Sequence, residues 1–224
     1  MPRPFLRRLL AISCFVLVFS AANILAEAAE EDDSKPLIDW NFDEALKSND
    51  SETGVLALGN DGQWSAKIED GEYVVANHDD KDAVRYVQLG LSEGDKPLDL
   101  SVSSVDVDVD GTFEDKDSGA GVLYRFDPEG KTYLAFVLTK DGYQILKRDE
   151  SGLQTVSQGA HSYHDGATLE VNTLDSGKVE FRINDKVVGS IDGTGFEGNH
   201  AGMIAIGRGE FYFDNFQVYS PDAE

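Results

Sequence analysis

The sequence predicts an all-β domain in which two antiparallel sheets pack as a sandwich. From residue 37 onward, short runs of alternating apolar and polar residues are separated by turn dipeptides, a pattern that half-buried strands produce. No window longer than about ten residues shows the 3.6-residue period of an amphipathic helix. Many short strands at close spacing are typical of a two-sheet jelly roll.

Turn residues divide the chain into individual strands. Asp70-Gly71 and Asp141-Gly142 are hairpin signals, and Asp127-Pro128-Glu129-Gly130 is a turn signal. Alternation assigns Val84, Tyr86 and Gln88 to one face of their strand. The predicted strands are 37–42, 66–69, 72–76, 83–89, 98–110, 121–126, 132–140, 143–148, 153–157, 168–173, 179–183, 186–191, 203–206 and 211–219.

The N-terminus has the pattern of a secretory signal peptide. Arg3, Arg7 and Arg8 precede an apolar run over 9–19, and Ala26-Glu27-Ala28 fits the small-x-small cleavage rule. We expect cleavage after Ala28, with Ala26 as the alternative site, and export to the periplasm or beyond. A membrane anchor is the competing interpretation, but the apolar run is shorter than the roughly 20 residues that cross a bilayer.

The only cysteine, Cys14, lies inside this segment. A lipoprotein would carry its acylated cysteine after the apolar run and not in its middle. Cleavage therefore leaves a mature chain that can form no disulfide. Residues 29–36 are expected to be a disordered acidic lead-in, and residues 37–220 a single domain, since β-sandwiches of this length are common.

The charge of the chain excludes some partners. The net charge is −23, and it becomes −25 when residues 1–28 are removed, because three arginines and one glutamate leave with them. Such a charge disfavours nucleic acid, which is bound mainly through Lys and Arg on phosphates, and it disfavours anionic membrane surfaces. It favours solubility and is compatible with divalent cations.

Three segments resemble a known superfamily. They are GAGVLYRFDPEGKTYLAFVLTKDGYQILKRDESG (119–152), VEFRINDKVVGSI (179–191) and AGMIAIGRGEFYFDNFQVYS (201–220). The chain is similar, over about residues 37–220, to bacterial members of the concanavalin A-like lectin/glucanase superfamily, the laminin-G-like jelly rolls. The resemblance implies the fold, and it leaves sugar-binding modules, glycoside hydrolases, enzymes of 3-keto sugars and adhesion modules open.

Catalysis in this superfamily uses carboxylates spaced along one strand face. The chain lacks the usual Glu-x-Asp-x-(x)-Glu run, but Asp106, Asp108 and Asp110 alternate with valines and therefore share a face. Neighbours two residues apart are about 6.6 Å apart along a strand, within the range that inverting glycosidases use. Asp106 and Asp108 are thus weak catalytic candidates, and an outward acidic strand face is the simpler interpretation.

Aromatic and basic residues in the 119–152 segment suggest a sugar-binding face. Sugars are bound by stacking on aromatic rings and by planar hydrogen-bonding groups. Strict alternation places Tyr124 and Phe126 on one side and Arg125 on the other, and the face of Leu134, Phe136 and Leu138 is expected to be core. The predicted ligand-binding residues are Tyr124, Arg125, Tyr133, Tyr143, Lys147 and Arg148.

The resemblance also implies a structural Ca²⁺ where the first and last strands meet. Asp43 and Asp214 are the plausible oxygen donors. Calcium takes six to eight oxygens, so two carboxylates do not define a site, and local capping of backbone N–H groups is the alternative role. No cofactor is required by the sequence.

We therefore expect an exported, non-catalytic carbohydrate-binding domain with a glycan or polysaccharide as its partner. The first alternative is a glycoside hydrolase, or a hydrolase or lyase acting on a 3-keto sugar. A further alternative is an adhesion or protein-interaction module of the cell envelope. The sequence leaves the ligand and the oligomeric state open.

Overall fold

The structure is a computed structural model of the whole chain. It describes residues 36–43, 56–90, 104–162 and 166–219, and the backbone of 92–93 and 96–97. The predicted signal peptide and the lead-in up to residue 35 lie outside these ranges. No helix in the described ranges is long and apolar enough to span a membrane.

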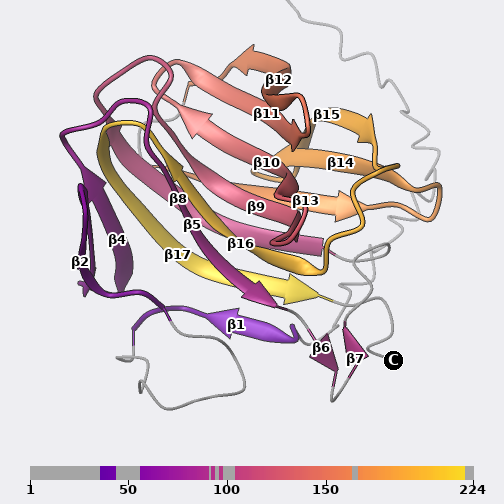
Figure 1. Cartoon of the computed structure of the whole chain (residues 1–224), viewed down its shortest axis with the longest axis horizontal. Helices are drawn as coiled ribbons and strands as arrows, with labels where there is room; N and C mark the ends of the chain where they lie inside the picture. The colour runs from indigo at the N-terminus through magenta and orange to yellow at the C-terminus, as the bar shows by residue number, and fades with distance from the viewer. Residues whose placement is uncertain are drawn as a thin grey trace, which may run out of the picture. The chain divides into compact units, whose positions relative to one another are not determined.

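Two antiparallel sheets form the domain (Figure 1). The larger sheet has nine strands in the order β15-β14-β13-β8-β17-β4-β3-β2, and β1 pairs with the last part of β17. Its strands are β1 (Ile38–Trp40), β2 (Gly59–Asp61), β3 (Trp64–Glu69), β4 (Glu72–Asn77), β8 (Ser104–Phe113), β13 (Ala167–Thr173), β14 (Lys178–Ile183), β15 (Lys186–Asp192) and β17 (Gly209–Tyr219).

The second sheet has six strands in the order β12-β11-β10-β9-β16-β5. In Figure 1 it faces the viewer, and β8, β13 and β14 lie behind it. A separate two-stranded ribbon joins β6 (Ser92–Glu93) to β7 (Lys96–Pro97). The strands of the six-stranded sheet are β5 (Val84–Gly90), β9 (Gly119–Asp127), β10 (Thr132–Thr139), β11 (Gly142–Asp149), β12 (Gly152–Ala160) and β16 (His200–Ile206).

The main core lies between the inner faces of the two sheets. Strand β8 contributes Val105, Val107 and Val109, all buried, while the aspartates between them face outward. Strand β10 contributes Leu134, Phe136 and Leu138, as the sequence predicts. Apolar burial of this kind stabilises by about 25 cal/mol per Å², and it holds the two sheets together.

A second apolar cluster lies on the outer face of the six-stranded sheet. It contains the residues that alternate with the core residues of β9, β10, β11 and β16. Strands β9 and β10 are consequently buried on both faces, which explains their nearly continuous apolar sequences. The buried members are Leu123, Phe126, Tyr133, Ala135, Val137, Leu146 and Ile204.

A β-bulge in β9 breaks the predicted alternation. Leu123 pairs with Gly202 and Phe126 with His200, so that Tyr124 and Arg125 together oppose one residue of β16. Arg125 takes up the extra length in the left-handed conformation, with φ of 49°. The prediction that Tyr124 and Phe126 share a side is therefore wrong: Tyr124 joins the main core and Phe126 the outer cluster.

Most predicted strands are present within a few residues of their predicted ends. The Asp70-Gly71 hairpin is confirmed, and both turn residues have positive φ, which glycine adopts without strain. Strand β2 was not predicted, because Gly59-Asn60-Asp61 is typical of a turn and becomes a strand only by pairing with β3. Residues 98–103 of the predicted 98–110 strand lie outside the described ranges.

Candidate functional site

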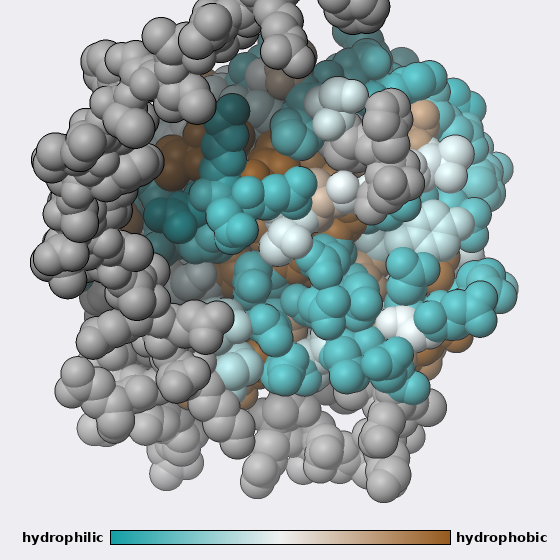
Figure 2. Space-filling model, turned by 180° about the vertical axis from the view of Figure 1, so that it is seen from behind, coloured by the Kyte–Doolittle hydropathy of each residue, from teal (hydrophilic) through white to brown (hydrophobic). Residues whose placement is uncertain are grey.

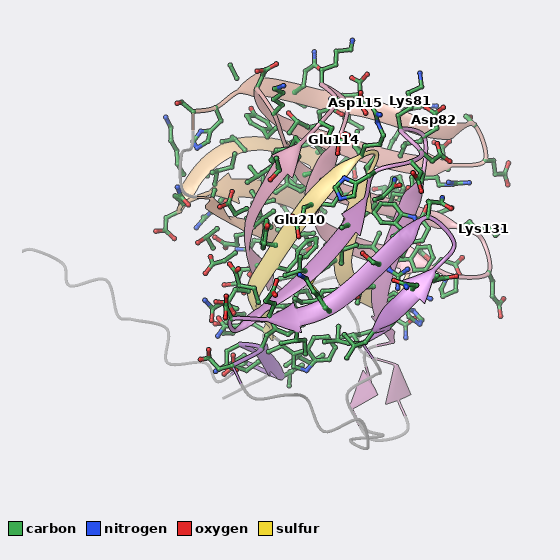
Figure 3. All side chains as sticks on the ribbon, turned by 90° about the vertical axis from the view of Figure 1, so that its left-hand side faces the viewer. Lys81, Asp82, Glu114, Asp115, Lys131 and Glu210 are labelled. Atoms are coloured by element: carbon green, nitrogen blue, oxygen red, sulfur yellow. The ribbon has the colours of Figure 1, made fainter. Side chains whose placement is uncertain are left out.

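The two sheets differ in what their outer faces carry. Outward positions of the nine-stranded sheet are rich in carboxylates, with few basic residues among them. Figure 2 shows the molecule from the side of this sheet, and its described surface is mainly hydrophilic. Figure 3 shows one of these carboxylates, Glu210, on β17. The outward acidic residues include Asp39, Glu72, Asp106, Asp108, Asp110, Glu170, Glu180, Glu210 and Asp214.

No outward strand position of the six-stranded sheet is Asp or Glu in the part of the chain that the structure describes. Its apolar residues form the outer cluster, and its polar residues are neutral or basic. Arg148 and His200 are its titratable nitrogen groups. The polar outward side chains are Gln88, Thr139, Gln144, Arg148, Thr155, Gln158 and His200.

Three aromatic rings meet on this face. The ring of Tyr86 stacks on Phe126, with 5.5 Å between centroids, and meets Tyr133 edge-on at the same distance. The ring centroids of Phe126 and Tyr133 are 6.0 Å apart, so each of the three rings contacts the other two. Tyr133 and Phe126 are buried, whereas Tyr86 is half-buried and keeps part of its surface accessible. Aromatic groups with one wet side are suited to recognition.

Arg148 lies against these rings from β11. It pairs across the strands with Tyr133, and its Nη1 donates to the Tyr86 hydroxyl over 3.5 Å. The hydroxyls of Tyr86 and Tyr133 are 3.2 Å apart. Burial and the neighbouring Tyr86 hydroxyl raise the pKa of Tyr133, while Tyr133 and Tyr86 raise that of Arg148. Tyr133 is therefore neutral and the guanidinium of Arg148 is charged at physiological pH.

His200 borders the rings on the other side. Its imidazole meets Phe126 edge-on, with 6.3 Å between ring centroids, and its Nδ1 is 3.1 Å from Oδ1 of Asn199. A Cβ atom at Gly90 would lie 2.9 Å from Nε2 of His200, so the glycine leaves the space that the imidazole occupies. Burial lowers the pKa of His200, which keeps the ring neutral at pH 7. We call Tyr86, Phe126, Tyr133, Arg148 and His200 the aromatic–arginine patch.

Tyr124 and Arg125 lie on the other side of this sheet. Tyr124 is fully buried between the sheets, and its hydroxyl is 2.8 Å from the Thr173 hydroxyl. Arg125 is 7% exposed, and its guanidinium donates to the carbonyl oxygens of Gly193 and Phe196. These contacts tie the loop after β15 to the bulge, so both residues have partners inside the fold.

Tyr143 and Lys147 also face away from the patch. The Tyr143 hydroxyl donates to the carbonyl of Val188, and its ring packs edge-on against Phe136 in the core. Lys147 forms an ion pair with Asp149, with 3.2 Å between Nζ and Oδ2. Of the six predicted ligand-binding residues, the structure thus brings Tyr133 and Arg148 together and separates the other four from them.

A polar cleft of about 370 Å³ lies on the acidic face. Asp108, on its wall, accepts a hydrogen bond from the Thr168 hydroxyl at 2.5 Å and one from Nδ2 of Asn215 at 2.8 Å. Burial and neighbouring carboxylates raise the pKa of Glu72 and of Asp214. The cleft is lined by Glu72, Asp108, Val109, Asp110, Gly166, Ala167, Thr168, Asn184, Tyr212 and Asp214.

Asp106 lies two residues along β8 from Asp108, on the same face. Burial, followed by the charge of Glu170 across the strand pair, raises its pKa from 3.8 to about 7. Its Oδ1 is buried and has no hydrogen-bond partner among the described residues. A carboxyl that is partly protonated near neutral pH, close to other carboxylates, is able to act as a general acid.

Burial and the charge of Asp108 raise the pKa of Asp214, and the charge of Asp43 adds a smaller increase. Asp43 and Asp214 are therefore close to each other. Asp214 also accepts from the backbone N–H of Asn215, as a local cap does. In the described ranges, no three His, Cys, Asp or Glu side chains converge as a metal site. Calcium held by Asp43 and Asp214 stays a prediction.

The sequence pattern does not identify Tyr86, Phe126 and His200 as members of one site. Alternation does group Val84, Tyr86 and Gln88, but it does not tell which face of the strand is outward. Phe126 changes face only because of the bulge, and His200 reaches the rings only because β16 lies between β5 and β9. Tyr86 alternates with the apolar residues Val87 and Leu89, and this alternation is the one sequence feature that indicates an outward-facing aromatic ring.

No protein-family model matches the chain, and no curated protein matches it in sequence. Solved structures share its fold. A Bacillus subtilis protein of unknown function with a galectin-like fold superposes with a TM-score of 0.55 at 12% identity, over 82% of this chain and 95% of that one. The carbohydrate recognition domain of Emp46p in a potassium-bound form superposes with a TM-score of 0.52 at 15% identity, over 70% and 88%.

The GH43 protein BlXynB from Bacillus licheniformis also matches, with a TM-score of 0.52 at 14% identity, over 72% of this chain but only 35% of that one. At such identities the likeness establishes the fold. The chain is therefore an all-β, lectin-like jelly-roll sandwich of two antiparallel sheets.

Proposed function

We propose that this chain is an exported, non-catalytic carbohydrate-binding domain of concanavalin A-like type, and that it holds a glycan against the aromatic–arginine patch. The observation that carries the proposal is the patch itself: an accessible tyrosine ring with cationic and neutral hydrogen-bonding groups around it, on a sheet face whose described outward strand positions carry no carboxylate. The lectin-like fold supports the same function, as does the predicted signal peptide.

The chemistry of the patch suits a sugar. The C–H face of a pyranose packs against an aromatic ring, and Tyr86 offers such a ring at the surface. Hydroxyl groups require directional partners around it, and Arg148 on β11, His200 on β16 and Gln88 on β5 supply donors and acceptors on the same sheet face. Phe126 and Tyr133 are buried beneath and beside Tyr86, so they hold its ring in place.

The test compares two partly exposed tyrosines on opposite sheets. Tyr86→Ala removes the proposed stacking ring, and Tyr212→Ala, on the acidic face, is the matched control. Both variants and the wild type, as the chain from residue 29 onward, are applied to a glycan array, and hits are titrated by calorimetry. We expect Tyr86→Ala to weaken binding at least about tenfold, roughly 1.4 kcal/mol, with circular dichroism confirming that both variants fold.

Binding of no glycan by the wild type would contradict the proposal. Equal weakening by Tyr86→Ala and Tyr212→Ala would contradict the placement of the site on the six-stranded sheet.

A second candidate function is hydrolysis or lyase chemistry on a glucan or a 3-keto sugar at the acidic cleft. The raised pKa of Asp106, two residues along β8 from Asp108 in the cleft wall, is the specific observation that favours it, because a carboxyl that stays partly protonated near neutral pH can act as a general acid. Incubation with glucans and keto-disaccharides tests it. Turnover that Asp106→Asn and Asp108→Asn abolish would favour the enzyme, and no turnover by the wild type would exclude these substrates.

A further inference from the structure

Arg148 differs from the other arginines that the structure describes. Arg182 pairs with Glu180 and Glu170, and Arg208 binds Asp115 through two hydrogen bonds of 2.9 Å. Figure 3 shows Asp115 beside Glu114 at one end of the sandwich. Arg85 lies 3.6 Å from Asp61, and buried Arg125 donates to backbone carbonyls. Arg148 has no Asp or Glu within ion-pair distance in the described ranges, and its partners there are the phenol oxygens of Tyr86 and Tyr133.

The lack of an acidic partner for Arg148 among the described residues is unusual, because this chain has 42 Asp and Glu against 19 Lys and Arg. A guanidinium has five N–H donors, and two phenol oxygens do not use all of them. Leu153, its cross-strand neighbour on β12, is 42% exposed and has no acceptor. Arg148 is half-buried and partly accessible, so its remaining donors are available to a ligand.

We infer that the glycan held at the aromatic–arginine patch is acidic, and that Arg148 binds a carboxylate of a uronic-acid unit whose ring packs on Tyr86; this inference rests on the proposed function. Arg–carboxylate pairs are commonly bidentate and about twice as strong as neutral hydrogen bonds. A carboxylate on the sugar also explains why the face has an arginine where an uncharged donor would serve a neutral sugar.

The net charge of the protein does not oppose this assignment. The Debye length at physiological ionic strength is about 8 Å, so exposed charges farther away are largely screened. The carboxylates of the nine-stranded sheet are separated from the patch by the thickness of the sandwich, since stacked sheets lie about 10 Å apart. At the margin of the patch, the charge of Asp127 acts to raise the pKa of His200. The Asp127 carboxylate accepts hydrogen bonds from the backbone N–H groups of Glu129 and Gly130.

The test uses pairs of polymers that share a sugar backbone and differ in whether the carboxyl is free or methyl-esterified. Polygalacturonate and alginate are each compared with their methyl esters, which keep the sugar ring and lose the negative charge. Poly-L-glutamate provides carboxylates without sugar. Affinities are measured by calorimetry for the wild type, Arg148→Gln, Arg148→Lys and the control Arg182→Gln, which removes a paired arginine from the acidic face.

We expect at least one uronate polymer to bind at least about tenfold more tightly than its ester, with an affinity that falls as NaCl is raised. Arg148→Gln should remove this preference, so that the uronate polymer binds no more tightly than its ester. Arg148→Lys should restore only part of it, because an ammonium lacks the bidentate fork. Arg182→Gln should bind like the wild type.

Tyr86-dependent binding of neutral glycans with no preference for uronates would overturn this inference and leave the proposed function standing. Binding of poly-L-glutamate as tight as that of uronates would overturn it in favour of a general carboxylate site. Binding of no glycan at all would remove both.

Discussion

The outer faces of the two sheets show how differently one alternating pattern can be used. On β8, valines face the core and aspartates face solvent. On β10, core residues alternate with Tyr133, Ala135 and Val137, which are buried as well. Alternation therefore tells which residues share a face, and the tertiary structure decides whether that face is wet. The acidic face presents its charges to solvent, and the apolar face carries the aromatic–arginine patch at which we propose that a ligand binds.

The largest effect should come from placing a carboxylate on the apolar outer face. Val137 is 1% exposed in the outer cluster, so Val137→Asp buries an unpaired charge at about constant volume. We expect a loss of more than about 3 kcal/mol in the free energy of unfolding. The matched change on the acidic side, Ser65→Asp on exposed β3, should stay within about 0.5 kcal/mol. Urea denaturation measures both changes. Similar losses in the free energy of unfolding would contradict the conclusion that one outer face is buried and the other exposed.

The two arginines of the 119–152 segment should differ in their roles: Arg125 should contribute to stability, and Arg148 to glycan binding. Arg125→Gln leaves the carbonyls of Gly193 and Phe196 without their donor, at a cost of about 2 kcal/mol in unfolding free energy. Arg148→Gln should change thermal stability little, because that side chain is partly exposed. Differential scanning calorimetry compares them. A stable Arg125→Gln variant with lost glycan binding would instead restore Arg125 as a ligand-binding residue.

Asp106 on the acidic face should contribute a loss of stability as the pH rises. The pKa of Asp106 is about 7 in the folded chain against 3.8 as its ordinary value, so the protonated form is favoured by folding. No penalty applies below about pH 4; it grows through the interval up to pH 7 and is complete above that. Because the carboxyl is partly solvated, we expect on the order of 2 kcal/mol.

Asp106→Asn cannot ionise and should flatten this dependence, matching or exceeding the wild type at about pH 8. Urea midpoints across the pH range measure the effect. A stability difference between the wild type and Asp106→Asn that does not change between pH 4 and pH 7 would contradict the raised pKa.

The smallest effect should come from Gly90, at the margin of the patch. A methyl group there would meet Nε2 of His200 at 2.9 Å, at the end of a side chain that can move. We expect Gly90→Ala to change the unfolding free energy by less than about 0.5 kcal/mol while shifting the NMR resonances of the His200 ring. Unchanged resonances would place His200 away from Gly90.

Much of the fold could be predicted from the sequence because strand periodicity and turn chemistry are local. The Asp70-Gly71 hairpin and the shared face of Asp106 and Asp108 follow from two-residue alternation alone. The site could be predicted only in part. Tyr133 and Arg148 lie on neighbouring strands of one meander, so their pairing is nearly local, whereas Tyr86 and His200 join them through strand order across the sheet.

The sequence by itself determined the all-β class, the acidity, the turns and the inward face of most strands, because each depends on residues close together along the chain. The tertiary structure alone decided which outer face is buried, that Arg125 forms a bulge which directs Tyr124 into the core and Phe126 outward, and that Arg148 meets phenols instead of carboxylates. Those outcomes depend on contacts between strands far apart in sequence, and no local pattern encodes them.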